Sequence, residues 1–319
     1  MKAIVVREFG GPEVLKLEEA AEPLPGAGQV LIRVKAVGVN PTETYQRSGM
    51  VRTAKPPYTP GSDAAGVVER VGSDVHGWRP GDRVYTAGTL SGSYAEMVLV
   101  RESQLHALPE RVSFSQGAGI NIPYATAFHA LAHVAHARAG ETVLIHGASG
   151  GVGIAACQLS RNLALTAIGT AGTDAGRALI LREGARHAVD HRAADQAEQI
   201  MKLAGGRGVD VILEMLANVN LGMDLKLLAP KGRVVIIGSR GDVTITPRDL
   251  MGRDASVHGM LLWNLSDADA LSTYAALGEG LEHGTLQPVV GVELPLAEAA
   301  QAHRRILEPG AHGKIVLIP

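Results

Sequence analysis

The sequence predicts a two-domain α/β protein, in which a β-rich domain accompanies a domain built on a doubly wound parallel sheet. The chain has 319 residues, which is too many for one small core. Its first part carries short apolar segments with a period of two, and strands alternate with helices afterwards. A glycine-rich turn joins the first strand of the alternating part to its first helix.

The composition narrows the class of protein. Hydrophobic residues make up 46% of the chain, which is enough for two cores, and the formal net charge is −2. That charge gives no support to binding of nucleic acid or of an anionic membrane surface. No apolar run reaches the 18 residues of a membrane span. The only cysteine, Cys157, excludes an internal disulfide and a thiolate zinc site, and we expect a cytoplasmic location.

The first part, residues 1–121, is expected to be mostly β-structure. Gly and Pro turns separate its apolar segments, which favours a barrel or a sandwich. The expected strands are residues 2–6, 29–39, 64–72, 82–87 and 94–100.

The second part, residues 122–262, is expected to form the parallel sheet. A helix at residues 124–138 leads into it and is ended by Gly140. Strands are expected at residues 142–145, 165–170, 187–190, 209–214, 233–238 and 256–260, with helices at residues 151–161, 174–183, 193–203 and 219–228. This alternation is typical of βαβ units covered on both faces. After a helix at residues 267–283, the tail returns to a strand, helix, strand pattern, so we assign residues 263–319 to the β-rich domain.

The glycine-rich turn reads HGASGGVGIAACQ from His146 to Gln158. Gly147, Gly150 and Gly153 have the G-x-x-G-x-x-G spacing. In a Rossmann unit such glycines allow a tight turn, close approach of the backbone to a pyrophosphate, and packing of the helix on the strand. The free N–H groups at the helix start then receive the phosphate charge. The alternative is a glycine-rich turn without a ligand, but the strand before and the helix after it favour a dinucleotide.

The end of the second strand of the alternating part favours NADPH over NADH. An NAD site usually has an acidic residue there, which binds the ribose 2′-OH. Here residues 170–173 are small or hydroxylic, and Arg177 follows, either as a phosphate partner or as a solvated helix charge. Asp174, the nearest acid, is expected to cap the next helix. His191, after the third strand, could face the same corner.

Two further strand ends carry polar side chains. Asn218 and Asn220 follow the fourth strand, and Ser239 and Arg240 follow the fifth. Ligands of open α/β sheets bind beyond the carboxyl ends of the strands, so we expect these residues on the ligand side. Arg240 is either a phosphate partner or an exposed turn residue.

Several segments together resemble one family. The run GETVLIHGASGGVGIAACQLSR, residues 140–161, is similar to the quinone oxidoreductase/zeta-crystallin signature, and GVNPTETYQRSG, PYTPGSDAAGVVERVG, EMLANVNL and IGSRG are similar to other segments of the same family. The resemblance covers essentially the whole chain. It implies the medium-chain dehydrogenase/reductase architecture, in which a Rossmann domain interrupts a GroES-like β domain. It also implies NADPH as cofactor and reduction of quinones by one-electron or hydride transfer.

The resemblance also implies site residues, position by position. The residues that match cofactor contacts are Tyr45, Ser149, Gly150, Gly151, Val152, Gly172, His191, Asn220, Ile237, Gly238, Ser239 and Arg240. Arg177 joins this set on the argument from charge, and Lys314 could add a phosphate contact.

The sequence departs from the zinc-dependent branch of the superfamily. That branch has a Cys near Asn40, Gly-His-Glu near residues 61–63 and a second Cys further on, whereas this chain has Asn40, GSD and only Cys157. The ligands of a catalytic or structural zinc are therefore missing. A quinone is already electron-poor and needs only hydrogen bonds to its oxygens. We expect Tyr45 and Asn40 to border the nicotinamide in a cleft between the domains and to offer such bonds, unless they are plain loop residues.

Other readings stay open for some residues. His129, His133 and His136 share a helix face, which is either a metal site or a stripe facing solvent or another segment. Cys157 is either a buried core thiol or a nucleophile. The activity is either quinone reduction or reduction of an enal or enone, and the third hypothesis is an NADPH-binding structural or RNA-associating protein. The resemblance also implies a homo-oligomer, a dimer or a tetramer, through an edge strand such as SVHGMLLW.

Overall fold

The computed structural model describes residues 1–310 and 312–319, which form two compact units. The first contains Met1–Ile122 together with Gly278–Pro309 and Gly313–Pro319, and the second consists chiefly of Pro123–Leu277. The expected boundary at residue 262 lies before the long helix α9 (Asp267–Glu282), and the division between the units falls inside that helix. Among the described residues, no helix has the length and apolar character that crossing a membrane requires.

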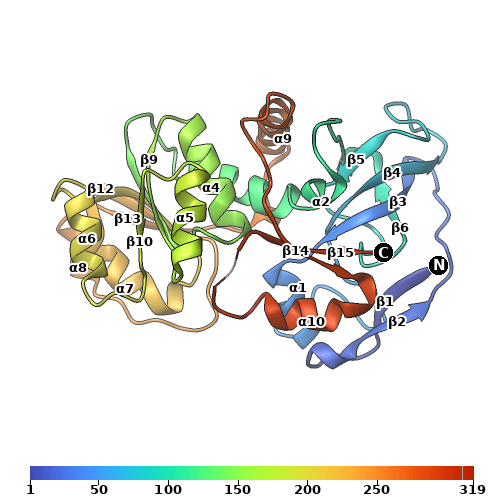
Figure 1. Ribbon diagram of the computed structural model, residues 1–319, viewed down its shortest axis with the longest axis horizontal. Coiled ribbons are helices and arrows are strands. Elements are labelled where there is room, and N and C mark those ends of the chain that lie inside the picture. Colours follow the sequence, from blue (N-terminus) through green and yellow to red (C-terminus); the bar gives the residue numbers. More distant parts are fainter. Residues whose placement is uncertain (311) are drawn as a thin grey trace. The chain divides into compact units, whose positions relative to one another are not determined.

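The first unit is built on strands, as the period-two segments predict. Its strands are β1 (Lys2–Val6), β2 (Leu15–Glu19), β3 (Gln29–Gly38), β4 (Asp63–Val71), β5 (Arg83–Thr86), β6 (Met97–Arg101), β7 (Leu105–Ala107), β14 (Val290–Pro295) and β15 (Lys314–Ile318). The main sheet has the order β14-β15-β3-β4-β5-β7, and β6 pairs with β3. The tail of the chain therefore returns to the main sheet, where β15 pairs antiparallel with β3, whereas β1 and β2 form a separate two-stranded sheet (Figure 1).

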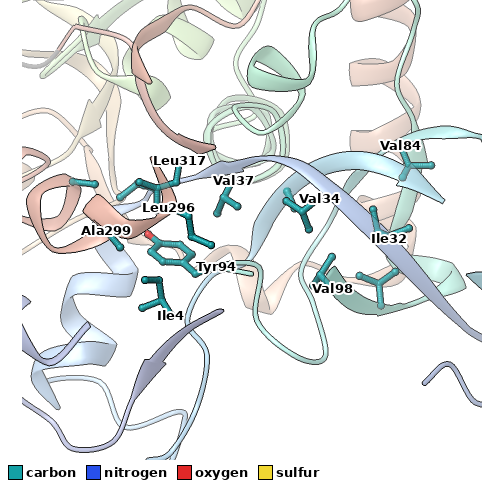
Figure 2. Close-up of a cluster of buried hydrophobic side chains, with 14 of the residues drawn as sticks. Ile4, Ile32, Val34, Val37, Val84, Tyr94, Val98, Leu296, Ala299 and Leu317 are labelled. Atoms are coloured by element: carbon teal, nitrogen blue, oxygen red, sulfur yellow. The ribbon is translucent and has the colours of Figure 1, made fainter. Parts of the chain in front are cut away.

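One apolar cluster fills the first unit. Figure 2 shows side chains from strands β1, β3, β5, β6 and β15, from residues 296–299 near the end of the chain, and that of Tyr94. Leu296, Ala299 and Leu317 come from the end of the chain, whereas Ile4 comes from its beginning. Each large aliphatic side chain buried in this way contributes about 1.5–3 kcal/mol relative to exposure. The cluster therefore holds both ends of the chain in one core.

The α-helices described wholly within the first unit are α1 (Pro41–Ser48), α2 (Phe114–Gly117) and α10 (Ala299–Arg305). Helix α1 is absent from the expected elements, although it carries Tyr45. The backbone N–H of Asn40 donates to the Glu43 carboxylate at 2.5 Å, and Pro41 occupies the first helical position. Gly49 ends the helix in the left-handed conformation, with φ of 78°.

The second unit confirms the predicted doubly wound sheet. Its strands are β8 (Thr142–Ile145), β9 (Thr166–Thr170), β10 (His187–Val189), β11 (Val209–Glu214), β12 (Leu228–Ile236) and β13 (Ser256–Gly259). Their order is β10-β9-β8-β11-β12-β13, and every neighbouring pair is parallel. The order reverses between β8 and β11, which is where ligands bind in sheets of this type.

Helices α4 to α7 pack along this sheet (Figure 1). The α-helices of this part of the chain are α3 (Thr126–Phe128), α4 (Gly151–Asn162), α5 (Asp174–Arg182), α6 (Gln196–Leu203), α7 (Ala217–Leu227), α8 (Pro247–Met251) and α9. The expected helix at residues 124–138 is instead α3 flanked by wider π-type turns at Asn121–Ala125 and His129–Val134. The predicted strands and helices of the alternating part otherwise agree with the structure to within a few residues.

Candidate functional site

The glycine-rich turn after β8 has one position, Gly153, at which no side chain fits. Gly147 has a φ of 55°, in the left-handed region. A Cβ added to Gly153 would lie 2.6 Å from the carbonyl oxygen of Gly147 and closer still to the Cα of Ala148. The first turn of α4 therefore packs directly on the backbone of the preceding loop, and only glycine fits at this position.

The N-terminus of α4 has the character of an anion site. Its N-cap is Gly150, and no side chain of the described residues caps it. The N–H groups of Gly151, Val152 and Gly153 precede the point where intrahelical bonding begins, so they need another acceptor. Ser149 is buried beside them. These groups suit a phosphate, whose charge the helix dipole also favours.

Cationic and imidazole side chains gather around the end of β9. A Cβ on Gly172 would lie 2.7 Å from Nε2 of His191 and 3.3 Å from Nε of Arg192. Arg192 is exposed and was missed in the sequence, although it directly follows His191 beyond the carboxyl end of β10. Burial lowers the pKa of His191, despite the opposing charge of Asp190. Two guanidinium groups, those of Arg177 and Arg192, therefore lie at this corner, together with the carboxylates with which they pair.

Arg177 reaches this corner already paired. Its guanidinium donates to Asp174 and to the carbonyl oxygen of Ala171, and it lies 3.0 Å from the carboxylate of Asp190. The expectation that Asp174 caps α5 is wrong: the hydroxyl of Thr173 accepts from the N–H of Gly176 at 3.0 Å. Thr173 caps because it precedes the first helical residue, which leaves the Asp174 carboxylate on the surface to pair with Arg177.

The ends of β11 and β12 form the third group of predicted residues. Asn220 donates to the carboxylate of Glu214 at 3.2 Å. The backbone N–H of Arg240 donates to the side chain of Asn218 at 2.9 Å, which ties the loop after β12 to helix α7. That loop contains Ile237, Gly238 and Ser239. The second unit thus places the predicted residues from Ser149 to Arg240 beyond the carboxyl ends of its strands.

The first unit contains a buried ion pair that the sequence did not predict. The ammonium of Lys314 lies 3.3 Å from the carboxylate of Asp63 and also donates to the side-chain oxygen of Asn40. Asn121 and the backbone N–H of Ile122 donate to the other carboxylate oxygen of Asp63, at 3.0 and 3.2 Å. Lys314, expected as a phosphate contact, is 5% exposed and is neutralised here.

Asn40 lies in the middle of this network. It is 2% exposed, and its amide donates to Glu43 at 3.1 Å, to Asp63 at 3.0 Å and to the carbonyl of Gly38 at 3.4 Å. Both amide hydrogens are therefore committed to groups of the protein in this structure. Its predicted contact with the nicotinamide or a quinone stays a prediction. Tyr45, on the same helix, is half-buried.

A second branch of the network runs behind Asn40. The hydroxyl of Tyr94 lies 3.2 Å from Glu43 and 3.0 Å from Nε2 of His303. Burial and the nearby charge of Asp63 raise the pKa of Glu43 to about 7, and burial lowers the pKa of His303 to about 3. His303 is therefore neutral at pH 7, and burial favours the protonated form of Glu43.

The residues present do not fit the zinc that the wider superfamily can carry. The positions matching its ligands include Asn40 and Asp63, and both contact the ammonium of Lys314 instead. Cys157 is buried, which raises the pKa of its thiol to about 12. A thiol in this state is neither a ready ligand nor a nucleophile.

The histidines at helical spacing pack against another helix. Nε2 of His133 lies 3.1 Å from the hydroxyl of Thr273, and its Nδ1 lies 3.3 Å from Asp269, at the start of α9. The ring of His129 lies beside that of His133, tilted by 45°, with ring centroids 5.7 Å apart. These contacts favour a stripe of histidines that faces another segment over a metal site.

Known protein families and proteins are similar to this chain in both of its units. The model of the alcohol dehydrogenase GroES-like domain matches residues 26–110, and that of the zinc-binding dehydrogenase matches residues 151–276. The quinone oxidoreductase of Homo sapiens is 50% identical over 322 residues, which cover 100% of this chain and 98% of that protein.

Two solved structures show the same likeness. The Escherichia coli quinone oxidoreductase complexed with NADPH is 28% identical with a TM-score of 0.91, and an NAD-dependent alcohol dehydrogenase is 29% identical with a TM-score of 0.93. Each comparison covers 100% of both chains. The similarity therefore spans both compact units.

Proposed function

The chain belongs to the quinone oxidoreductase family of the medium-chain dehydrogenase/reductase superfamily, and from this premise we propose how it reduces quinones with NADPH. The observation that carries the proposal is the turn at Gly153, where bare backbone amides meet an uncapped helix start. A phosphate of the dinucleotide satisfies those amides. The whole-chain identity to quinone oxidoreductases gives the class of acceptor.

The predicted cofactor residues divide between the parts of NADPH. The loop Ser149, Gly150, Gly151 and Val152 would hold the pyrophosphate on the N-terminus of α4. Gly172, Arg177 and His191, with Arg192, would hold the adenosine side, where the guanidinium groups of Arg177 and Arg192 can donate to the 2′-phosphate as well as to the aspartates with which they pair. The loops carrying Asn220 and Ile237, Gly238, Ser239 and Arg240 would hold the nicotinamide half. Bound NADPH supplies the electrons, and the protein supplies orientation.

Tyr45 and Asn40 are proposed as the residues on the substrate side. Tyr45 is half-buried, so part of its side chain can meet a flat acceptor. Asn40 is proposed to keep the start of α1 in place, since it joins Glu43, Asp63 and Lys314 in one network. No metal step is invoked, because the positions that match metal ligands are committed to Lys314.

Oxidation of NADPH, followed by its absorbance with 1,4-benzoquinone or 9,10-phenanthrenequinone, tests the proposed function. Parallel assays with α,β-unsaturated aldehydes and ketones separate a quinone reductase from an enal or enone reductase. Cytochrome c added to the assay reports any semiquinone that escapes. Absence of turnover with both quinones, in a protein that binds NADPH, would contradict the proposal.

Replacing Arg192 by alanine is expected to weaken NADPH binding about tenfold, or about 1.4 kcal/mol, and to leave NADH binding unchanged. Arg192 lies at the Gly172 corner, where its exposed guanidinium pairs with Asp190 at 3.5 Å and can also meet the 2′-phosphate, so its loss would remove a charge-assisted contact that NADH does not make. Fluorescence titration of the reduced nicotinamide measures both affinities. Arg186→Ala, also exposed but before β10 at the opposite end of that strand, is the matched control and should bind both cofactors as the unmodified protein does. Equal losses for NADPH and NADH in Arg192→Ala would contradict this assignment.

A homo-oligomer is proposed through strand β13, which lies at one edge of the parallel sheet. The residues after it include Leu261 and Trp263, which are 55% and 48% exposed. An exposed apolar edge needs cover, and a second copy would supply it. Light scattering distinguishes a monomer, which would contradict this proposal, from a dimer or a tetramer.

A cytoplasmic location stays a prediction.

A further inference from the structure

Three ionisable side chains meet at the point where the strand order of the second unit reverses. His146 follows β8, Glu214 ends β11 and Asp224 lies on α7. Nε2 of His146 lies 2.8 Å from Asp224 and 3.5 Å from Glu214. All three are buried, and both carboxylates have no exposed surface. We call this group the switch-point cluster.

Glu214 connects the cluster to the proposed cofactor loops. Its side chain accepts from the backbone N–H of Leu216 and from the amide of Asn220, the latter at 3.2 Å. Its backbone carbonyl accepts from the N–H groups of Ile237 and Gly238, at 2.8 and 3.2 Å. His146 directly precedes Gly147 of the glycine-rich turn. Glu214 and its partner His146 thus join three segments that are proposed to hold NADPH: the glycine-rich turn, the start of α7 and the loop after β12.

The cluster has too few hydrogen-bond donors to satisfy the oxygens of two ionised carboxylates. Oε2 of Glu214 and Oδ2 of Asp224 have no donor among residues 1–310 and 312–319, although both atoms are buried. Burial, and then the interaction with Asp224, raises the pKa of Glu214 to about 7, against the charge of His146. Burial alone would lower the pKa of His146, but its bond to Asp224 and the charge of Glu214 raise it. A proton between the two carboxyl groups satisfies both orphan oxygens.

We propose that Glu214 is a positioning residue for NADPH, and that the switch-point cluster takes up one proton, shared by Glu214 and Asp224, when the coenzyme binds. The inference rests on the proposed function and deepens it. With that proton and a charged His146, the cluster carries two opposite charges and no net charge. Loss of the proton leaves a net negative charge buried beside loops that would hold an anionic dinucleotide, and it removes the hydrogen bond that joins the carboxyl groups.

The sign of the pH dependence follows. Protonation of Glu214 favours binding, so NADPH affinity should be highest below pH 7 and should fall as the pH rises through this value. The groups facing Glu214 are His146 from β8 and Asp224 from α7. Beyond His146 lies His191, which in turn faces Asp190, Arg192 and Arg177. His191, whose pKa is lowered by burial, and the 2′-phosphate are also titratable, so the experiment must separate them from Glu214.

The test is fluorescence titration of NADPH and of NADH at pH 6, 7, 8 and 9. For the unmodified protein we expect Kd to rise about tenfold across this range, which corresponds to one pKa unit of coupling. NADH has no 2′-phosphate and should show the same rise. Glu214→Gln cannot lose a proton, so its Kd should be nearly independent of pH. Glu198→Gln, the same change on the exposed face of α6, is the matched control and should keep the full rise.

Calorimetry of NADH binding in two buffers of different ionisation enthalpy counts the protons directly. At pH 7.5 we expect net uptake by the unmodified protein and none by Glu214→Gln. If Glu214→Gln does not fold, Asp224→Asn takes its place, and this variant should also abolish the proton uptake. If neither variant folds, the unmodified protein alone decides. Absence of proton uptake by the unmodified protein then overturns the inference. An unchanged pH dependence in Glu214→Gln overturns it too.

Two other outcomes, a metal ion bound by the switch-point cluster and a failure to bind NADPH, can be told apart from the outcomes above. The three ligand atoms lie within 4.8 Å of one another, so a cation could also bridge them. Elemental analysis that finds a stoichiometric metal, lost together with NADPH affinity on chelation, would overturn the shared proton. Failure of the unmodified protein to bind NADPH at every pH would instead contradict the proposed function itself.

Discussion

Replacing Gly153 by alanine is expected to reduce NADPH affinity by at least about 100-fold, or about 2.7 kcal/mol. The new Cβ would lie 2.6 Å from the Gly147 carbonyl oxygen and from the carbonyl carbon of Ala148, and backbone atoms cannot rotate away as a side chain can. Helix α4 must therefore move off the loop, which separates the N–H groups of its first turn from the phosphate. Fluorescence titration measures the affinity, and thermal unfolding shows whether the unit still folds.

Gly222→Ala is the matched control for this change. Gly222 lies in helix α7 of the same unit, and a Cβ there would meet nothing within 4 Å. Alanine is the better helix former by about 0.5–1 kcal/mol, so this variant should be at least as stable as the unmodified protein. If Gly153→Ala bound NADPH as tightly as Gly222→Ala, the close packing of loop and helix could not be what the cofactor needs.

Replacing Asp63 by alanine is expected to destabilise the protein by about 3–5 kcal/mol, because it leaves the buried ammonium of Lys314 without its counter-charge. The side chains of Asp63 and Lys314 are 1% and 5% exposed. Asp63 also accepts from Asn40, Asn121 and Ile122, and these donors lose their partner as well. Denaturant unfolding measures the change in the free energy of unfolding.

Two further variants show whether burial of the charge is the cause. Glu69→Ala breaks the exposed pair with Arg33, where the side chains are 34% and 47% exposed, and should cost no more than about 1 kcal/mol. The double variant Asp63→Ala with Lys314→Met removes both charges and should recover part of the lost stability. A loss in Asp63→Ala no larger than in Glu69→Ala would refute this account.

The parallel sheet could be predicted because its signals are local. Each strand is a short apolar run, and each helix follows within a few residues, so the alternation can be read directly from the chain. Helix α1 also had a local signal that the period-two reading of the first part obscured. Asn40, Pro41 and Glu43 are a favoured N-cap, a favoured first residue and the acceptor of a capping box.

The buried networks could not be predicted from the sequence. Lys314 meets Asp63 across 251 residues, and His146 meets Asp224 across 78. No periodicity or spacing relates such positions, because the topology of the sheet alone brings them together. Arg192 is a different case, because it follows a predicted strand and directly succeeds His191, so its place at this corner could be predicted from the sequence.

The return of the chain to the sheet of β3 has a consequence for synthesis on the ribosome. Lys314 begins β15 and meets Asn40 across 274 residues, whereas the second unit consists chiefly of one continuous segment, Pro123–Leu277. The nucleotide-binding half can therefore mature while translation continues, but the other half must wait for its closing strand. Until that strand emerges, the flank of β3 that it will cover is an open template for pairing with another nascent chain.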